Sequence, residues 1–316
     1  MKTGLWGMRS RKCSWKYCFL VTGLLVLLLS DLHYRMLVVY AQDDQSQQYD
    51  WRASMTDRIN VQLHGADIKS RLIDLSSLNA AGRGWGWNAE RDAMNRPVTA
   101  MQYQLRYSSY GADFIIPTDE KVLYLTFDAG TEYGQTERVL DVLQEKNISA
   151  IFFCVGSYVR SQPDLVRRMI HDGHVVGNHS MTHPSGGFVN LSPDTQSKQI
   201  MDMHQYMNDH FQYNMYLFRA PSGEFSERTI GIANNLGYRN LYYSFAYKDW
   251  DSRERYSDSE TLAKLEQALH PGAIYMLHMV APANSDILPE FIDFARSQGY
   301  KFGDYRDTLE LRPCQR

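Results

Sequence analysis

The chain has 316 residues, which is the length of one large domain or two small ones. Hydrophobic residues make up 44% and charged residues 22%, as in globular proteins, so a wholly disordered or fibrous chain is excluded. The net charge of −3 gives no basic excess for binding nucleic acid, and four cysteines are too few for a fold built on disulfides.

The N-terminus has the pattern of an export signal. Residues 1–16 contain five Lys or Arg and no acid, and residues 18–30 carry no charge and are rich in Leu and Val. A basic stretch followed by about 7–15 apolar residues is typical of a signal sequence. We therefore assign residues 1–16 to a basic cytoplasmic region and residues 17–41 to a signal anchor or a signal peptide. Either form predicts export, to the extracytoplasmic face of the membrane or, after cleavage, to the cell wall.

Two less regular regions follow. Residues 42–60 are rich in Gln, Asp and Ser, which is typical of a tether. Residues 61–120 include the sequence GRGWGW at 82–87, whose glycines indicate a packing loop rather than a helix or strand. We expect residues 61–120 to form an N-terminal extension that packs on the domain after it, residues 121–312.

From residue 121 onward, short apolar runs alternate with helical patterns. The predicted strands span residues 122–127, 151–155, 175–176, 216–219, 241–245 and 273–278. The predicted helices run from 136 to 146, from 163 to the stop at Gly173, from 193 to about 210, from the cap at Ser226 to the stop at Gly237, from 260 to 269 and from 287 to 297. This alternation predicts a parallel sheet covered by helices, either open or closed into a barrel.

Polar residues follow five of these strands. The sequence reads TFDAG at 126–130, NHSMTHP at 178–184, RAPSG at 219–223, DW at 249–250 and LH at 277–278. The carboxyl ends of parallel strands face the ligand in α/β proteins, so we expect these clusters on one rim of the fold.

His179 and His183 stand four residues apart, so one helical turn or a tight loop would aim both imidazoles at one point. The spacing suits a divalent metal, most often zinc, whose catalytic sites have about three protein ligands. Two surface or capping histidines would give the same short motif, which alone does not decide between the two interpretations.

Four further side chains could carry catalysis. Asp128 follows an apolar strand, where it could act as a general base or cap a turn. His278 ends another apolar strand, and Asp249 could orient its ring. Arg219 could pair with a buried carboxylate through its planar guanidinium. Each residue alone has a structural alternative, and their shared placement at strand ends is what indicates a reactive site.

With these motifs in this order, residues 122–309 resemble a polysaccharide deacetylase of carbohydrate esterase family four. Within the family, the chain is most similar to the bacterial delta-lactam-forming peptidoglycan de-N-acetylases. The likeness lies in TFDAGTEYG at 126–134, FSERT at 225–229, HPGAIYMLH at 270–278 and GWGW at 84–87. The resemblance implies an α/β fold, a distorted (β/α) barrel with fewer than eight full units that forms a single catalytic domain.

The resemblance also implies a role for the charged residues. Asp128 would be the base that deprotonates the attacking water, and His179 and His183 would hold a divalent metal. Arg219 would keep Asp128 ionised and oriented. His278 would protonate the departing sugar amine.

The same resemblance gives roles to four neighbouring residues. Asp249 would assist His278 in its proton transfer. The backbone N–H near Ser222 would help to hold the tetrahedral oxyanion. Trp250 and Leu277 would line a small pocket for the acetyl methyl group.

One position departs from the family pattern. The family motif usually begins TFDD, and its second aspartate completes a His-His-Asp metal site, whereas Ala129 stands here. The delta-lactam-forming relatives also lack an aspartate at this place, so the change does not by itself abolish activity. We expect a divalent ion, zinc above others, to bind weakly, with water, substrate or another side chain completing its coordination.

The resulting hypothesis is metal-assisted, hydrolytic removal of N-acetyl groups from peptidoglycan amino sugars during cell-wall modification, with N-acetylmuramic acid preferred. Two alternatives stay open: a deacetylase of N-acetylglucosamine in chitin-like or exopolysaccharide chains, and a glycan-binding pseudoenzyme whose site has decayed at Ala129. The expected partners are peptidoglycan or another N-acetylated glycan and, through the N-terminal segment, the membrane. No feature of the sequence demands more than a monomer.

Overall fold

The computed structural model describes residues 72–84, 90–251, 253 and 256–310. The predicted cytoplasmic region, anchor and tether lie outside these residues, as do both tryptophans of the GWGW motif. All described residues belong to one compact unit, Asp57–Arg316. No helix within the described ranges is long and apolar enough to cross a membrane.

A parallel sheet of nine strands forms the centre of this unit. Its strands are β2 (Ala112–Asp113), β3 (Val122–Ala129), β4 (Ile151–Cys154), β5 (Val175–Asn178), β6 (Leu217–Phe218), β8 (Arg239–Leu241), β9 (Phe245–Ala246), β10 (Ala273–His278) and β11 (Lys301–Phe302). They lie in the order β2-β8-β6-β5-β4-β3-β10-β9, and β11 pairs with the start of β3. Two further strands, β1 (Arg83–Gly84) and β7 (Glu224–Phe225), pair antiparallel beside it.

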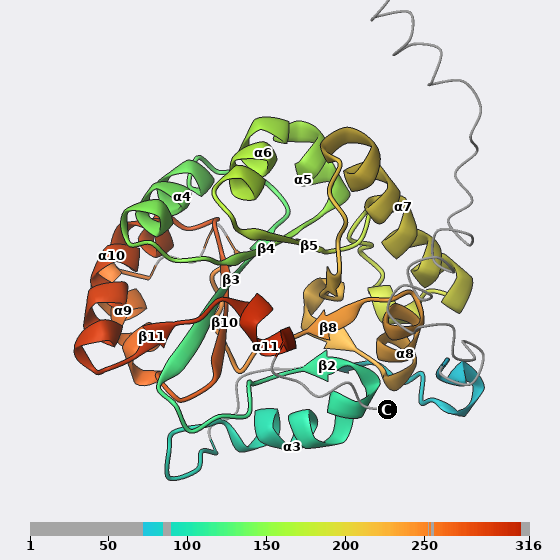
Figure 1. Ribbon diagram of the computed structural model, residues 1–316, viewed down its shortest axis with the longest axis horizontal. Coiled ribbons are helices and arrows are strands. Elements are labelled where there is room, and N and C mark those ends of the chain that lie inside the picture. The colour runs from blue at the N-terminus through green and yellow to red at the C-terminus, as the bar shows by residue number, and fades with distance from the viewer. Residues whose placement is uncertain (1–71, 85–89, 252, 254–255, 311–316) are drawn as a thin grey trace, which may run out of the picture. The chain divides into compact units, whose positions relative to one another are not determined.

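Helices surround the sheet on its outer side, as Figure 1 shows. They are α3 (Val98–Tyr107), α4 (Thr136–Glu145), α5 (Gly156–Ser161), α6 (Pro163–His171), α7 (Pro193–Phe211), α8 (Glu227–Asn235), α9 (Asp258–Gln267) and α10 (Pro282–Ser297). Helix α11 (Tyr305–Glu310) instead lies inside this ring, near the middle of the view. Short 3-10 turns are η2 (Leu75–Ser77), η3 (Ser108–Tyr110), η4 (Phe188–Asn190) and η5 (Pro221–Gly223). The curled sheet with its helices is a half-barrel, which confirms the predicted fold class of a distorted (β/α) barrel.

Local chemistry explains where several of these elements begin and end. Helix α6 has Pro163 in its first turn and is followed by Gly173, whose φ of +82° is a left-handed conformation that glycine adopts without strain. Helix α9 begins at a capping box, in which Ser257 and Glu260 satisfy each other's backbone N–H groups. Strand β3 lies between β4 and β10 in the sheet, and seven of its eight residues are buried as a result.

The predicted strand 241–245 is divided between two strands. Strand β8 ends at Leu241 and β9 begins at Phe245. Between them, the backbone N–H of Tyr242 donates to Asp113 of β2, and that of Ser244 donates to Ile274 of β10. The chain therefore changes partners within three residues, and a continuous apolar run in the sequence does not reveal such a change.

The region expected to be an extension contributes to the sheet itself. Strand β2 pairs with β8 in parallel, and helix α3 precedes it. Further upstream, Ile73 is bound to α8. Its backbone N–H donates to the side chain of Asn235, and its carbonyl accepts from that side chain, each at 2.9 Å. A strand of two residues is too short to show a hydrophobic period, so sequence patterns did not indicate it.

Candidate active site

The chemically active side chains gather at the carboxyl ends of the strands. This rim carries Asp128 in β3, His179 directly after β5, Arg219 directly after β6, Ser222 in η5, Asp249 and Trp250 after β9, and His278 at the end of β10. Strands β3 and β10 are neighbours, and His278 lies opposite Asp128 in their register. The two side chains therefore share one face of the sheet.

Arg219 is completely buried and holds one oxygen of Asp128 in place. Its Nη1 donates to Asp128 Oδ1 at 2.7 Å and to Thr126 Oγ1 at 2.8 Å. Its Nε and Nη2 donate to the carbonyl oxygens of Leu241 and Tyr242 at 2.8 and 3.0 Å. Because three of its nitrogens are bound to fixed acceptors, the guanidinium is rigid and orients the carboxylate.

The second oxygen of Asp128 faces a histidine. Asp128 Oδ2 lies 3.6 Å from His179 Nε2, beyond hydrogen-bond distance. Burial opposes the charged form of Asp128, but the positive charge of Arg219, helped by His179 and His278, holds the pKa of this carboxyl below its ordinary value. The carboxylate is thus ionised at neutral pH, with one oxygen still able to accept a proton.

His179 is held in a single tautomer. Its Nδ1 lies 2.8 Å from the carbonyl oxygen of Arg219, which can only accept, so Nδ1 carries the proton. Burial lowers the pKa of His179 to about 4, against the opposing attraction of Asp128, so the ring is neutral at neutral pH. The lone pair of Nε2 therefore points away from the carbonyl, on the side of Asp128.

A strained loop carries the second histidine next to the first. Ser180 and His183 have φ angles of +67° and +48°, which non-glycine residues seldom adopt. The backbone N–H of His183 donates to Ser180 Oγ at 3.1 Å, and Asn178 Oδ1 accepts from the N–H of Ser180 at 2.9 Å. The ring centres of His179 and His183 are 5.3 Å apart. The HxxxH spacing thus brings the two imidazoles together through a loop, without a helical turn.

The donor set suits a divalent metal only in part. Two neighbouring imidazoles, one with a fixed tautomer, are ligands that zinc accepts, and a second hydrogen bond that orients the ring is typical of metal-binding histidines. Ala129 supplies no ligand atom. Among the described residues, no group of three or more His, Cys, Asp or Glu side chains is arranged to hold a metal ion. His179 and His183 therefore fit an ion whose remaining ligands come from elsewhere.

His278 and Asp249 form a second charged pair. Asp249 Oδ1 lies 2.7 Å from His278 Nδ1, and its Oδ2 accepts from the backbone N–H of His278 at 2.7 Å. Burial opposes the charged form of the imidazole, but Asp249 and, more weakly, Asp128 hold the pKa of His278 above its ordinary value, against Arg219. Because Nδ1 is bound to the carboxylate, Nε2 is the ring nitrogen left for a substrate.

Asn284 supports this pair and was not among the predicted site residues. It lies in the first turn of α10, and its Nδ2 donates to Asp249 Oδ2 at 2.7 Å and to the carbonyl oxygen of His278 at 2.8 Å. Its Oδ1 accepts from the hydroxyl of Tyr247 at 2.5 Å. A buried asparagine with every polar atom in use fixes the orientation of Asp249.

A cavity of about 440 Å³ joins these groups. It is lined by the predicted residues Asp128, His179, His183, Ser222, Trp250 and His278, and by Gly130, Thr131, Tyr133, Val155, Gly223, Tyr243, Met276 and Val280. Ser222 has a left-handed backbone, with φ +64° and ψ +13°, at the rim of the cavity. Trp250 is 53% exposed, with its ring centre 5.9 Å from that of His278.

Leu277 does not line this cavity. Successive residues of a strand point to opposite faces, so His278 and the residue two positions before it share the cavity side. That residue is Met276, which lines the cavity, whereas Leu277 is buried on the opposite face of β10. The alternation along the strand, counted back from His278, would have identified Met276.

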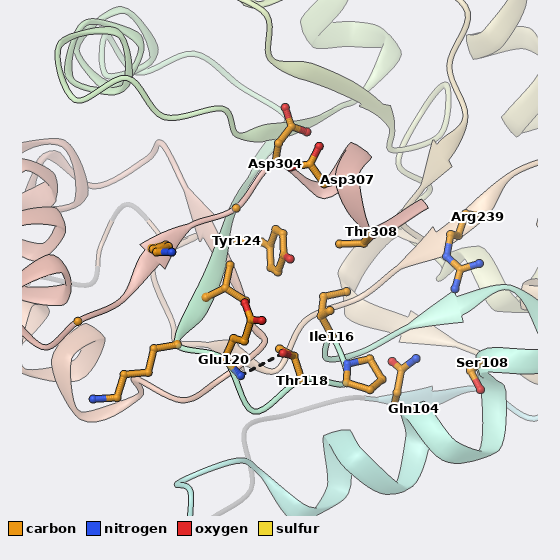
Figure 2. Close-up of a pocket in the computed structure, with 16 residues that line it drawn as sticks. Gln104, Ser108, Ile116, Thr118, Glu120, Tyr124, Arg239, Asp304, Asp307 and Thr308 are labelled. Carbon is orange, nitrogen blue, oxygen red and sulfur yellow. Dashed lines mark hydrogen bonds between the residues drawn. The ribbon is translucent and has the colours of Figure 1, made fainter. Parts of the chain in front are cut away.

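A larger cavity, of about 1030 Å³, lies at the other end of the sheet. Figure 2 shows Tyr124, Arg239, Asp304 and Asp307 around it, near the amino ends of β3, β8 and β11. None of the predicted site residues lines it.

A comparison with known proteins identifies the family. The model of the family described as polysaccharide deacetylase matches residues 116–241. The peptidoglycan-N-acetylmuramic acid deacetylase PdaA of Bacillus subtilis is 35% identical over 230 residues, which cover 71% of this chain and 85% of that protein. The chain belongs to the polysaccharide deacetylase family.

Solved structures agree with this assignment. The structure of Bacillus subtilis PdaA, described as a family 4 carbohydrate esterase, matches this deacetylase with a TM-score of 0.69 and 30% identity, over 74% of this chain and all of that one. A family 4 carbohydrate esterase from Bacillus anthracis gives a TM-score of 0.60 at 30% identity, over 74% and 99% of the two chains. The deacetylase is thus a hydrolase of a family that generally depends on metal, which accords with two imidazoles beside its carboxylate.

Proposed function

We propose that this deacetylase hydrolyses the N-acetyl groups of peptidoglycan amino sugars and prefers those of N-acetylmuramic acid. The observation that carries the proposal is the pairing of Asp128 with His278 across β3 and β10 in one cavity. Amide hydrolysis needs a base for water and an acid for the leaving nitrogen. The lowered pKa of Asp128 and the raised pKa of His278 shift the two groups toward the ionised forms that these roles need. The relative named for N-acetylmuramic acid supports the choice of sugar.

Asp128 is the base of the proposed reaction. Its Oδ2 takes a proton from the attacking water, whose oxygen then adds to the carbonyl carbon of the acetamide. Arg219 holds Oδ1 by a hydrogen bond of 2.7 Å, so the carboxylate keeps its orientation while the other oxygen works. Removal of the positive charge would raise the cost of a buried carboxylate, so Arg219 is a positioning residue for this step.

His278 is the acid. The C–N bond of the adduct breaks as Nε2 of His278 gives its proton to the nitrogen, and the products are acetate and a free sugar amine. Asp249 stabilises the charged imidazole and holds Nδ1 protonated, so that Nε2 is the nitrogen that exchanges the proton. Asn284 acts through Asp249.

His179 and His183 would hold a divalent cation, with zinc expected because imidazole nitrogens are among its preferred ligands. The ion, when bound, polarises the carbonyl of the acetamide as a Lewis acid. The carbonyl of Arg219 keeps His179 in the tautomer that offers Nε2. Because Ala129 provides no third ligand, calorimetric titration with zinc should give a lower affinity for the wild type than for Ala129→Asp. Equal affinities would contradict this explanation.

Three further residues would surround the acetyl group. The backbone N–H near Ser222 is expected to donate to the oxyanion, because η5 turns at the rim of the cavity with this residue in a left-handed conformation. Trp250 and Met276 line the cavity beside His278 and would contact the methyl group. Leu277, on the opposite face of β10, would support the strand and not the ligand.

We also propose that the protein is exported and that residues 17–41 anchor it or serve as a signal peptide, with residues 42–60 as a tether. The relative that acts on peptidoglycan supports an extracytoplasmic place of action. A fusion of residues 1–60 to a reporter enzyme that is active only outside the cytoplasm tests export. An inactive reporter, despite normal synthesis, would contradict it.

The test of the proposed reaction is the release of acetate from purified glycan strands. The full-length protein, with zinc, should release acetate and leave free amines on the muramic units, as detected by mass spectrometry, and a chelator should abolish the release. Release from glucosamine units alone would favour a chitin-like or exopolysaccharide substrate. Strand binding with no release from any N-acetylated glycan would favour a pseudoenzyme.

A further inference from the structure

Two large apolar side chains that the structure leaves exposed belong to the site cavity. Among the described residues, four such side chains are exposed: Leu72, Leu105, Tyr133 and Trp250. Tyr133, 47% exposed, and Trp250 line the cavity of 440 Å³, whereas the two leucines do not. The two aromatic residues among these four thus lie at the cavity. A ligand bound there can cover their exposed ring surface and remove it from water.

Tyr133 stands on a loop that a carboxylate network holds in place. The neighbouring Glu132 accepts through Oε1 from the backbone N–H groups of Gln135 at 3.0 Å and Thr136 at 3.3 Å. Its Oε2 accepts from the hydroxyl of Thr136 and, at 3.0 Å, from that of Tyr158. Because the backbone beside Tyr133 is already fixed, little loop entropy is lost when a ligand covers the ring.

We propose that Tyr133 is a sugar-binding residue, whose ring stacks on a pyranose unit next to the one that loses its acetyl group. The inference rests on the proposed function, because it takes a glycan strand as the ligand. A pyranose ring has an apolar C–H face and a polar edge, and tyrosine offers a matching flat face with a hydroxyl at its tip.

The two exposed rings come from different loops, and in this proposal each contacts a different unit of the strand. Trp250 lies beside His278, with 5.9 Å between ring centres, and so beside the reacting amide. Tyr133 lies on a different loop, between β3 and α4, and lines the same cavity. Two platforms on two loops hold a chain of sugars, whereas one platform would suffice for a single sugar. Tyr133 therefore contributes to the binding of strands and not to the chemical step.

The experiment compares Tyr133→Ala and Tyr133→Phe with the unchanged protein. Calorimetry in the Asp128→Asn background, where turnover is expected to be slow enough to measure binding, should show that Tyr133→Ala weakens the binding of a peptide-free tetrasaccharide. The expected loss is about tenfold, the value of one lost aromatic contact. Binding of single N-acetylmuramic acid should not change. Tyr133→Phe, which keeps the ring face, should bind the tetrasaccharide as before. With Asp128 intact, Tyr133→Ala should raise KM for strands and leave kcat unchanged.

Leu105→Ala is the matched control, because Leu105 is 86% exposed on α3 and does not line the cavity. This variant should bind as the wild type does. Equal tetrasaccharide affinities of wild type and Tyr133→Ala would overturn the inference, and so would an equal loss for the single sugar, since both exclude a neighbouring unit. Loss of strand affinity in Tyr133→Ala, when the wild-type protein itself releases no acetate, would refute the proposed function and leave Tyr133 as a strand-binding residue without a neighbouring reaction.

Discussion

The two ends of the sheet each contain an arginine–aspartate pair, and they differ in how completely the carboxylate is bonded. At the amino end, both oxygens of Asp113 are occupied. Arg239 donates to Oδ2 at 2.6 Å and to Oδ1 at 3.0 Å, Tyr305 donates its hydroxyl to Oδ2 at 2.5 Å, and Gln104 donates to Oδ1 at 2.9 Å.

At the carboxyl end, Asp128 also pairs with an arginine, but its second oxygen accepts no hydrogen bond within the described residues. Arg219 occupies Oδ1, while the nearest ring nitrogen to Oδ2 is that of His179, at 3.6 Å. A buried carboxylate with all its acceptor sites filled stabilises a fold, whereas one with an open oxygen beside a cavity can take a proton. The two ends therefore differ in how much hydrogen-bonding capacity their carboxylate oxygens have left. Cavity size does not identify the reactive end, because the larger cavity, of about 1030 Å³, lies at the amino end.

The largest expected effect is on Asp128. Asp128→Asn removes the open oxygen's basicity and keeps an acceptor for Arg219, so kcat should fall about 10³-fold, within the range for loss of a general base. Circular dichroism should still report a folded chain. Acetate release measures the loss, and Asp113→Asn, at the amino end, is the control that should keep wild-type turnover. Undiminished release by Asp128→Asn would reject its assignment as the base.

The next effect is on stability and concerns Asp113. Asp113→Ala leaves the guanidinium of Arg239 and the hydroxyl of Tyr305 without their acceptor, so the free energy of unfolding should fall by about 3 kcal/mol. Urea denaturation measures this change. Turnover per folded molecule should not change, because none of these side chains reaches the site cavity. A loss of kcat at unchanged stability would contradict the assignment of a purely stabilising role to Asp113.

The carboxyl end was largely predictable from sequence. Apolar strands that end in Asp128 and His278 are conspicuous, because a titratable group after a buried run needs a partner or a function. Arg219 and Asp249 could be proposed as those partners, and the structure brings each within 2.7 Å of its predicted acceptor or donor. What the family resemblance added was the assignment of chemical roles to them.

Other features depend on contacts between distant segments, which no local pattern encodes. Asn284 sits in an ordinary helix start, and its importance arises from its contacts with Asp249 and His278 in space. Helix α5 (Gly156–Ser161) is too short to show a period, and Asp113 belongs to a strand of two residues. The ion pair at the amino end was therefore not visible in the sequence, although its carboxylate, Asp113, is completely buried.

A smaller, pH-dependent effect is expected at His278. As the proposed proton donor it must be protonated, so kcat should fall as pH rises through its pKa, which Asp249 and Asp128 raise and Arg219 and burial lower. Asp249→Asn removes the main raising charge, so the basic limb of the profile should move to lower pH and kcat at pH 7 should fall about tenfold. Asn284→Ala should shift the limb in the same direction by less.

The pH profile of kcat measures the effect of both Asp249→Asn and Asn284→Ala. Asp304→Asn, beside the cavity at the amino end, is the control and should leave the profile in place, because Asp304 lies outside the site cavity and is not among the main groups that shift the pKa of His278. A basic limb that stays where it is in Asp249→Asn would show that His278 is not the group that loses its proton there.

The smallest effect on activity separates the two faces of β10. Met276→Val shortens a side chain in the cavity and should raise KM about fourfold, the value of one buried methylene. Leu277→Val shortens a side chain on the opposite face and should instead lower the free energy of unfolding by about 1 kcal/mol, with KM unchanged. Steady-state kinetics and urea denaturation on both variants distinguish these outcomes. If Leu277→Val raised KM and Met276→Val did not, the side chain of residue 277 would contact the acetyl group, and strand alternation counted from His278 would be the wrong guide to this pocket.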